Sequence, residues 1–468
     1  MTKEPRQKAV LVAVKLPDVT EGDFESSLTE LGRLVSTLGY DVVGEVIQPR
    51  DHIAAAAVLG EGRLLDLAEL TGGSGHVGTT APKKKDKARM RREAEGHEHE
   101  REHEREHGHG HDDDDDDEDE DEGALGEAPE PKVQLVAVDH DISPSQARNL
   151  ERASGTQVLD RTGVIIEIFH RHAKSREARL QVEIARLAYT APRVRESPSG
   201  KERQRGRGAG EAAIELDRRQ IRDRIAELKD ELARIQAEQG VRRAHRRQAR
   251  RVALVGYTNA GKSSLMRALT ASHVYVEDKL FATLDTTVRA LQPEVHPRIL
   301  VSDTVGFIKK LPHDLVASFK STLDEAHEAS LLLHVVDASD PAWEAQHDVT
   351  REVLAEIGAD VVPSVLVMNK VDRIAAPDLR RLEAKLPNAW FISAHDPKDV
   401  AEVRERIIAF FEDAYEEAEL VVPYDRQRLV SEMHEVGKVC EERYEEAGVI
   451  VRFRGEPETI ARLRSRLA

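Results

Sequence analysis

A nine-residue stretch, Gly256–Ser264, constrains the fold of this chain more than any other segment. It reads GYTNAGKSS, follows the apolar run Val252–Val255 and precedes a helix-like segment that starts at Leu265. A strand, a glycine-containing loop and a helix in this order are what a phosphate-binding loop requires. Its glycines let backbone N–H groups approach phosphates, Lys262 can reach the β and γ oxygens, and the Ser263 hydroxyl can coordinate Mg²⁺. The segment therefore predicts a nucleotide-binding α/β domain.

Length and composition limit the class of protein. A chain of 468 residues predicts about three domains. It has one cysteine, so no internal disulfide bond can form, which favours a reducing cytoplasm. The first residues lack the apolar core of a signal peptide, and no apolar run approaches the roughly 20 residues of a membrane span. We therefore expect a soluble, cytoplasmic monomer with no membrane span.

The net charge of −18 is distributed unevenly. Residues 74–131 hold 21 acidic and 9 basic residues, whereas residues 193–251 hold 18 basic and 10 acidic ones. The acidic segment includes six consecutive aspartates, and its apolar content is too small to offset chain entropy, so we expect a disordered insertion. The basic segment concentrates positive charge in one place, which is compatible with a nucleic-acid partner despite the acidic total.

The chain is predicted to be a multidomain α/β protein. Strand–helix alternation on both sides of the insertion predicts a small α/β domain over residues 8–172. Residues 173–250 predict an antiparallel helical hairpin, a coiled coil with a basic Gly/Arg tip at 190–210. A mainly parallel sheet with the phosphate-binding loop is expected over 251–415. Residues 416–468 predict a small α/β appendage with a helix from about Arg426 to Ala447. The apolar stripes expected to pair in the hairpin are Leu180, Ile184 and Leu187 on the first helix and Ile214, Ile221, Ile225, Leu228, Leu232 and Ile235 on the second.

A segment about 110 residues downstream identifies the base. Asn369-Lys370-Val371-Asp372 follows an apolar run, so it lies at the end of a predicted strand. A carboxylate there accepts two hydrogen bonds from guanine N1–H and the 2-amino group, a donor pair that adenine lacks. We expect Asn369 to tether the phosphate-binding loop and the Lys370 stem to lie along the base. Backbone N–H groups after the next strand are predicted to face the guanine carbonyl, namely those of Ser393, Ala394 and His395.

Two segments between these motifs predict contacts to Mg²⁺ and the γ-phosphate. Asp303 follows an apolar run and would hold Mg²⁺ through a water, and the Gly306 N–H would contact the γ-phosphate. Thr283 is the expected first-switch threonine, which closes over Mg²⁺ only when the γ-phosphate is present; Thr286 and Thr287 compete for this role. Lys262 and Thr283 are the predicted catalytic residues. The predicted nucleotide contacts are Gly256, Tyr257, Thr258, Asn259, Ala260, Gly261, Lys262, Ser263, Ser264, Phe281, Ala282, Thr283, Leu284, Asp285, Asp303, Thr304, Val305, Gly306, Asn369, Lys370, Val371, Asp372, Ser393, Ala394 and His395.

One residue type is absent from its expected position. In Ras-like enzymes a glutamine after the glycine of this segment orients the attacking water. Here Phe307 follows Gly306, and Ile308 comes next; neither side chain can hold a water. We therefore expect slow GTP hydrolysis that a partner accelerates.

Together these motifs resemble one family. GYTNAGKSSL, FATLD, DTVGFIKKLPHDLVASFKSTLDEA, LLLHVVDAS and VMNKVD are similar to the HflX family, within the Obg–HflX group of P-loop GTPases. The resemblance covers most of residues 8–73 and 132–411, the tail more weakly, and not the insertion. It differs at Asp285-Thr-Thr287, where Asp-Pro-Thr is usual, and at Gly208-Ala-Gly210, where Gly-Pro-Gly is usual.

The resemblance implies a GTPase that binds the large ribosomal subunit and splits stalled or idle ribosomes under stress. It places rRNA contacts in the hairpin tip, where arginines and glycines suit phosphates and unstacked bases. The predicted RNA contacts are Arg193, Arg195, Arg203, Arg205 and Arg207.

Two alternatives stay open at this stage. Six histidines within 97–111 are similar to the metal-storage tracts of nickel-delivery GTPases, and such a tract binds Ni²⁺ or Zn²⁺ at least adventitiously. Those proteins need a metal site at the GTPase domain, usually with a cysteine, and Cys440 lies far from that domain in sequence. The second alternative is a non-ribosomal RNA remodeller that uses the same basic hairpin.

Overall fold

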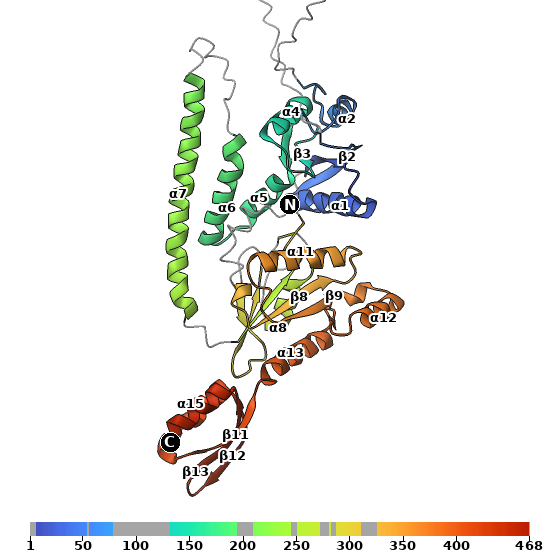
Figure 1. The fold of residues 1–468 in the computed structure, drawn as a ribbon. Helices are drawn as coiled ribbons and strands as arrows, with labels where there is room; N and C mark the ends of the chain where they lie inside the picture. Colours follow the sequence, from blue (N-terminus) through green and yellow to red (C-terminus); the bar gives the residue numbers. More distant parts are fainter. Residues whose placement is uncertain are drawn as a thin grey trace, which may run out of the picture.

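The computed structural model of the chain describes residues 6–53, 56–77, 132–193, 209–244, 250–271, 280–281, 287–309 and 325–467. In the helix at 209–244, side chains are described from 216 to 238. All but the first four residues of the predicted insertion lie outside these ranges, as does most of the predicted Gly/Arg tip. Figure 1 shows the described elements.

The N-terminal domain is built on a four-stranded parallel sheet in the order β2-β1-β3-β4. Val10 and Val12 of the central strand pack on one face, and Leu11 and Ala13 pack on the other, as expected for a parallel sheet covered on both sides. Helices α1 and α5 cover one face, and α2 and α4 cover the other. The bounds are β1 (Gln7–Lys15), α1 (Glu21–Thr37), β2 (Tyr40–Pro49), α2 (Glu61–Thr71), β3 (Leu135–Val138), α4 (Pro144–Ser154), β4 (Gln157–Asp160) and α5 (Arg161–His172).

Helices α6 (Arg176–Thr190) and α7 (Ala209–Ala244) form the predicted hairpin beside this domain (Figure 1). A short 3-10 turn, η1 (Ala191–Arg193), follows α6. Arg176 of α6 bonds Glu231 of α7 at 2.7 Å. The apolar seam contains Leu180, Ile184, Leu187, Ile225, Leu228, Leu232 and Ile235. The predicted stripe is therefore confirmed along most of its length; Ile221 is half-buried outside this cluster, and the side chain of Ile214 lies outside the described residues.

The nucleotide-binding domain has a six-stranded sheet in the order β10-β9-β8-β5-β7-β6, in which β6 alone runs antiparallel to its neighbour. Helices α8 and α13 pack on one face, and α11 packs on the other. Its mainly parallel sheet agrees with the prediction. The bounds are β5 (Arg250–Gly256), α8 (Lys262–Thr270), β6 (Thr287–Ala290), β7 (Ile299–Asp303), β8 (Leu331–Asp337), α11 (Trp343–Glu356), β9 (Ser364–Asn369), η2 (Val371–Arg373), α12 (Ala376–Lys385), β10 (Trp390–Phe391) and α13 (Pro397–Glu412).

The C-terminal appendage differs from the prediction in one element. The helix expected from Arg426 to Ala447 ends at Val436, and residues 438–445 form a strand instead. This strand pairs with β13 from Lys438 to Glu445, with an irregularity between Val439 and Glu441. Long-range pairing therefore outweighs the local preference of its lysine, arginine and glutamates for a helix. The bounds are β11 (Glu416–Val422), η3 (Tyr424–Arg426), α14 (Arg428–Val436), β12 (Lys438–Glu445), β13 (Gly448–Gly455) and α15 (Pro457–Leu467).

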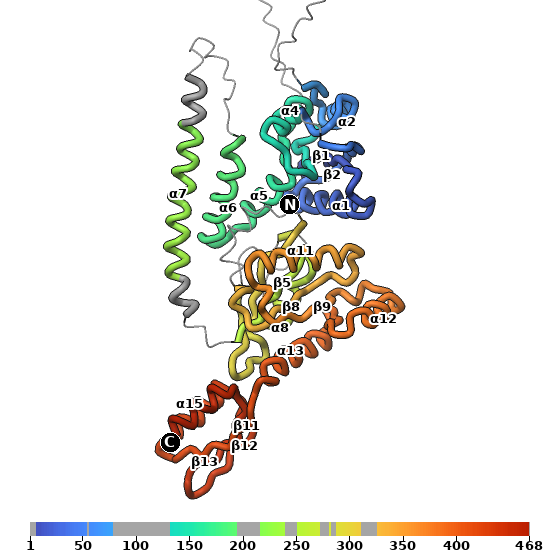
Figure 2. Tube along the Cα trace, in the orientation of Figure 1, coloured from blue at the N-terminus to red at the C-terminus, as the bar shows by residue number. Residues whose placement is uncertain are grey.

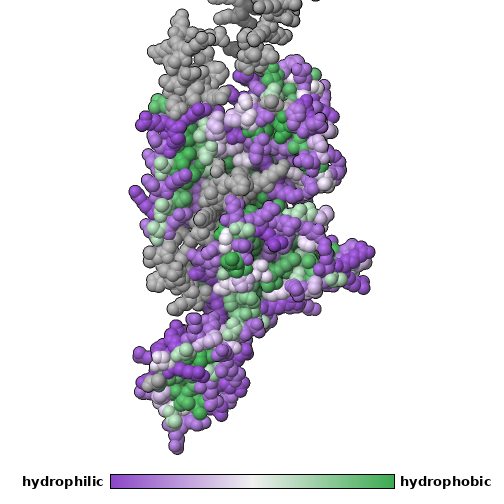
Figure 3. Space-filling model, in the orientation of Figure 1, coloured by the Kyte–Doolittle hydropathy of each residue, from purple (hydrophilic) through white to green (hydrophobic). Residues whose placement is uncertain are grey.

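The three sheets follow one another along the molecule, with the nucleotide-binding domain in the middle (Figure 2). Helix α12 protrudes from this domain, buries none of its residues and lies in a mostly hydrophilic part of the visible surface (Figure 3). Within the described ranges, we find no helix with the length and apolar character needed to cross a bilayer.

Candidate nucleotide-binding site

The phosphate-binding loop connects β5 to α8, and its backbone requires glycine at both ends. Gly256 has a φ of 145°, and a Cβ there would lie 2.1 Å from the carbonyl oxygen of Val335. Gly261 has a φ of 96°, and its Cβ would lie 2.2 Å from Nδ2 of Asn369. Any side chain at either position would displace a neighbouring strand or the guanine-side loop, so the loop keeps this shape only with glycine.

Lys262 is the cation of the loop. Its side chain is 6% exposed, and its Nζ donates to the carbonyl oxygens of Gly256, at 3.0 Å, and Tyr257, at 2.8 Å. Burial lowers the pKa of Lys262 to about 8, against the opposing effect of Asp303. A buried ammonium curled over the loop is suited to bind phosphate oxygens, because they would add negative charge next to a cation that burial disfavours.

Ser263 and Asp303 place two side-chain oxygens next to each other beside the loop. The Ser263 hydroxyl donates to Oδ2 of Asp303 at 2.6 Å, and Asp303 is fully buried at the end of β7. A hydroxyl and a carboxylate are hard oxygen donors of the kind that Mg²⁺ prefers, so this pair fits the predicted ion. Of the threonines considered for the first switch, Thr283 and Thr286 lie outside the described residues, whereas Thr287 begins β6 and pairs with Asp303.

The segment 303–309 is held against the phosphate-binding loop by backbone hydrogen bonds. The Phe307 N–H donates to the Gly256 carbonyl at 3.1 Å, and the Thr258 N–H donates to the Phe307 carbonyl at 2.8 Å. A Cβ on Gly306 would lie 3.1 Å from Nζ of Lys262. Both Phe307 and Ile308 are buried in apolar clusters, so neither side chain is placed to orient a water, as the sequence predicts.

The guanine side of the site is organised by Asn369. Its Nδ2 donates to the Ala260 carbonyl at 2.8 Å, which is the predicted tether to the phosphate-binding loop. Its Oδ1 accepts from the Ala394 N–H at 3.0 Å, so one amide side chain joins two loops. Lys370 has a φ of 64°, and its Nζ donates to the Asn259 carbonyl and to Asp337, both at 2.7 Å.

Asp372 lies exposed in η2, where a carboxylate can meet the edge of a base. A hydrogen bond with Ser393 holds the pKa of the Asp372 carboxyl below its usual range, so this group accepts hydrogen bonds at neutral pH. The three backbone N–H groups expected to face the guanine carbonyl have partners within the chain. Ser393 donates to Asp399 at 2.7 Å, Ala394 to Asn369, and His395 to the Ser393 hydroxyl at 3.4 Å. The His395 contact is the longest, so His395 is the best placed of the three to turn toward a ligand.

Some predicted site residues lie elsewhere. Phe281 is buried against the N-terminal domain, edge-to-face with Phe169 at 4.6 Å between ring centroids. The ring of Tyr257 also points to that domain. No local sequence pattern predicts that Phe281 and Tyr257 contact the N-terminal domain, because their partners come from distant segments. The predicted contacts Ala282, Thr283, Leu284 and Asp285 lie outside the described residues.

Arg193 is engaged inside the N-terminal domain. Its guanidinium donates to Asp160 at 2.6 Å and lies over the Tyr189 ring at 3.5 Å from the centroid. This placement does not favour the predicted RNA contact for Arg193. The other four predicted RNA contacts, Arg195, Arg203, Arg205 and Arg207, lie outside the described residues.

Three features together define a P-loop GTPase. They are a phosphate-binding loop after a central strand, a Ser–Asp pair whose aspartate is buried, and an NKxD segment at the end of a parallel strand. Comparison with known proteins agrees with this class. Residues 251–370 match the family described as "50S ribosome-binding GTPase". Residues 25–77 and 124–170 match "GTP-binding GTPase N-terminal", and residues 172–246 match "GTP-binding GTPase Middle Region".

The chain belongs to the HflX GTPase family. It is 57% identical to GTPase HflX of Gluconacetobacter diazotrophicus, over 100% of this chain and 99% of that protein. It is 40% identical to GTPase HflX of Escherichia coli, over 68% of this chain and 76% of that protein. Among solved structures, a GTP-binding protein from Sulfolobus solfataricus in complex with GDP is 21% identical, covers 86% of this chain and 98% of its own, and has a TM-score of 0.41.

Proposed function

We propose that this GTPase binds the large ribosomal subunit and uses GTP to split stalled or idle ribosomes. The match of residues 251–370 to a family described as "50S ribosome-binding GTPase" carries the proposal. The excess of basic residues over 193–251, on the hairpin segment, supports an rRNA partner because it would neutralise phosphates. The alternative of a metal-delivery GTPase has less support, because the one cysteine of the chain, Cys440, lies exposed in the C-terminal appendage and not in the nucleotide-binding domain.

The proposed roles of the site residues follow from their chemistry. Lys262 binds and neutralises the β and γ oxygens, and Asp372 accepts hydrogen bonds from guanine. The Ser263 hydroxyl and Asp303 would hold Mg²⁺, Asp303 through a water, and Thr283 would complete this set in the GTP state. Mg²⁺, when bound, neutralises charge on the phosphates. The described residues supply no side chain that orients the attacking water, so we expect the ribosome to complete the catalytic arrangement.

The test compares the GTPase rate of the full chain with and without purified large ribosomal subunits. We expect turnover to rise at least tenfold, because a partner must supply or order the water-orienting group. A second test uses the variant Arg203→Gln/Arg205→Gln/Arg207→Gln, which lacks three positive charges. This variant should co-sediment less with the large subunit, and its binding should depend less on salt concentration. The matched control, Arg380→Gln/Arg381→Gln/Lys385→Gln, removes three exposed positive charges from α12 and should leave binding unchanged.

Equal rates with and without subunits would contradict the proposal. If the chain binds free RNA as tightly as it binds the large subunit, the RNA remodeller becomes the better interpretation. A variant that lacks residues 78–131 should retain the stimulation, since the family match that carries the proposal lies in 251–370.

A further inference from the structure

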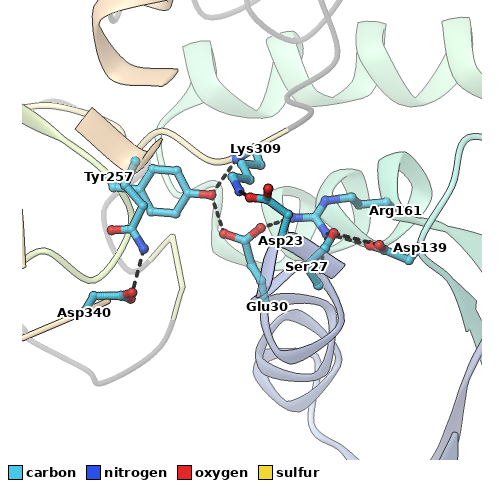
Figure 4. Close-up of polar contacts among 9 residues, drawn as sticks. Asp23, Ser27, Glu30, Asp139, Arg161, Tyr257, Lys309 and Asp340 are labelled. Atoms are coloured by element: carbon cyan, nitrogen blue, oxygen red, sulfur yellow. Dashed lines mark hydrogen bonds and ion pairs between the residues drawn. The ribbon is translucent and has the colours of Figure 1, made fainter. Parts of the chain in front are cut away.

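The second residue of the phosphate-binding loop connects the nucleotide site to the N-terminal domain. Tyr257 is 5% exposed, and its hydroxyl donates to Glu30 of helix α1 (Figure 4). The same hydroxyl accepts the backbone N–H of Lys309 at 2.7 Å. One phenol oxygen therefore joins helix α1, the phosphate-binding loop and the 303–309 segment.

Glu30 is itself fixed from behind. Arg161, which is 1% exposed, binds Glu30 and donates to Asp139 at 2.7 Å (Figure 4). Burial raises the pKa of Glu30, and the neighbouring Arg161 and the Tyr257 hydroxyl oppose this rise. A carboxylate with two partners in an enclosed setting has little freedom to move, so Glu30 presents a fixed acceptor to Tyr257.

Further contacts hold the same segment against the same helix. Lys309 Nζ pairs with Asp23 of α1 at 3.3 Å. Val305 and Ile308 are buried in an apolar cluster that also contains Leu31 of α1 and Phe169 of α5. The 303–309 segment is therefore clamped between the phosphate-binding loop and the N-terminal domain.

This clamp bears on the γ-phosphate. A Cβ on Gly306 would lie 3.1 Å from Nζ of Lys262, so the ammonium lies beside Gly306 with room for no side chain between them. A γ-phosphate oxygen that is bound by both groups must enter between them. Because Nζ of Lys262 is held by the carbonyl oxygens of Gly256 and Tyr257, Gly306 takes up at least part of this separation. Lys309 follows Gly306 by three residues. A movement of Gly306 would therefore stretch and weaken the hydrogen bond from the Lys309 N–H to the Tyr257 hydroxyl. GDP has no γ-phosphate and imposes no such movement.

We propose that Tyr257 and Glu30 are positioning residues through which the N-terminal domain sets the preference of the site for GDP over GTP. Glu30 holds the Tyr257 hydroxyl, the hydroxyl holds Lys309, and Lys309 keeps Gly306 close to Lys262. The coupling is reciprocal, so a partner that displaces α1 from Tyr257 would favour the GTP state. The inference rests on the GTPase site and not on the ribosomal proposal, because it is tested with nucleotide alone.

The test substitutes Tyr257→Phe in the full chain, which removes the hydroxyl and keeps the ring. Its readout is the ratio of affinities for a non-hydrolysable GTP analogue and GDP. We expect this ratio to rise about fivefold, which is the factor that corresponds to the free energy of one lost hydrogen bond. The GDP affinity should change less than twofold. Glu30→Gln should shift the ratio in the same direction by a smaller factor, because its single amide oxygen is shared between Tyr257 and Arg161 while the hydroxyl that accepts from Lys309 is kept. Tyr444→Phe and Glu25→Gln, at exposed positions in the C-terminal domain and on α1, should leave the ratio unchanged.

A second measurement distinguishes a Tyr257 hydroxyl that couples the nucleotide site to α1 from one that only stabilises the phosphate-binding loop. Hydrogen exchange in α1 should differ between the GDP and GTP-analogue complexes of the parent chain, and this difference should fall by at least half in the Tyr257→Phe variant. Equal loss of affinity for both nucleotides would overturn the inference, since it would mean that the hydroxyl only supports the loop. An unchanged affinity ratio, or an unchanged exchange difference, would overturn it as well.

Discussion

Lys262 shows how a residue that is obvious from a motif acquires a property that the motif does not contain. The GKS pattern predicts a cation at the phosphates, and the structure adds that this cation is buried with a pKa of about 8. Its pKa in the folded chain lies below that of an exposed lysine. Between pH 8 and about 10.5 the unfolded chain therefore binds more protons than the folded one, and stability without nucleotide should rise with pH across this window.

Nucleotide binding should show the opposite pH dependence. Phosphate oxygens favour the charged ammonium, so affinity should fall as pH rises through 8. For a pKa of 8 we expect GDP affinity to drop about fourfold between pH 7 and pH 8.5. Titration calorimetry in two buffers of different ionisation enthalpy should show proton uptake at pH 8.5. Lys262→Arg, which stays charged, should bind without this uptake, and proton uptake by that variant would contradict the assignment.

Contacts within short motifs of the nucleotide site were predictable from the sequence, whereas contacts between distant segments were not. The glycines, Lys262 and the Asn369 tether were predictable because each belongs to a short motif whose spacing is fixed by the ligand. The contact between Tyr257 and Glu30 spans 227 residues and follows no periodicity. Its partners become visible only when the two domains are placed together, so sequence reasoning assigned Tyr257 to the nucleotide and did not single out Glu30.

At the scale of elements, regular apolar patterns were predictable, and pairing between distant segments was not. The hairpin was predictable from the spacing of its apolar residues. A helix has between three and four residues per turn, so apolar residues at this spacing lie on one face. The strand β12 was not predictable, because Lys438–Glu445 is mostly exposed and has no apolar face of its own. Its conformation is determined by the pairing with β13.

The hairpin offers a matched pair of leucines on one helix. Leu228 of α7 is 2% exposed in the seam with α6, whereas Leu216 is 56% exposed. Leu228→Ala should lower the free energy of opening of the hairpin by about 3 kcal/mol, because it removes buried methyl groups and leaves a cavity. Leu216→Ala should change it by less than about 0.5 kcal/mol. Native-state hydrogen exchange in α6 measures both, and equal effects would show that the seam does not hold the helices together.

At the scale of the whole molecule, the N-terminal and nucleotide-binding domains share one apolar cluster. It contains Leu31 and Phe169 from the first domain and Phe281 and Ile308 from the second. The C-terminal appendage has a separate cluster built on its own sheet, which includes Leu463. Since buried apolar contacts couple the stabilities of the parts that share them, the first two domains should unfold together and the appendage independently.

The two tryptophans of the chain, Trp343 and Trp390, both lie in the nucleotide-binding domain, so their fluorescence reports its unfolding. Leu31→Ala lies in α1 and is expected to cost about 2 to 5 kcal/mol. If the domains unfold as one unit, this substitution should lower the urea midpoint of the tryptophan signal although it lies in the other domain. Leu463→Ala should leave that midpoint unchanged while destabilising the appendage. A tryptophan midpoint that is insensitive to Leu31→Ala would show that the shared cluster does not couple the domains, and GTP-dependent movement of α1 would then need another route.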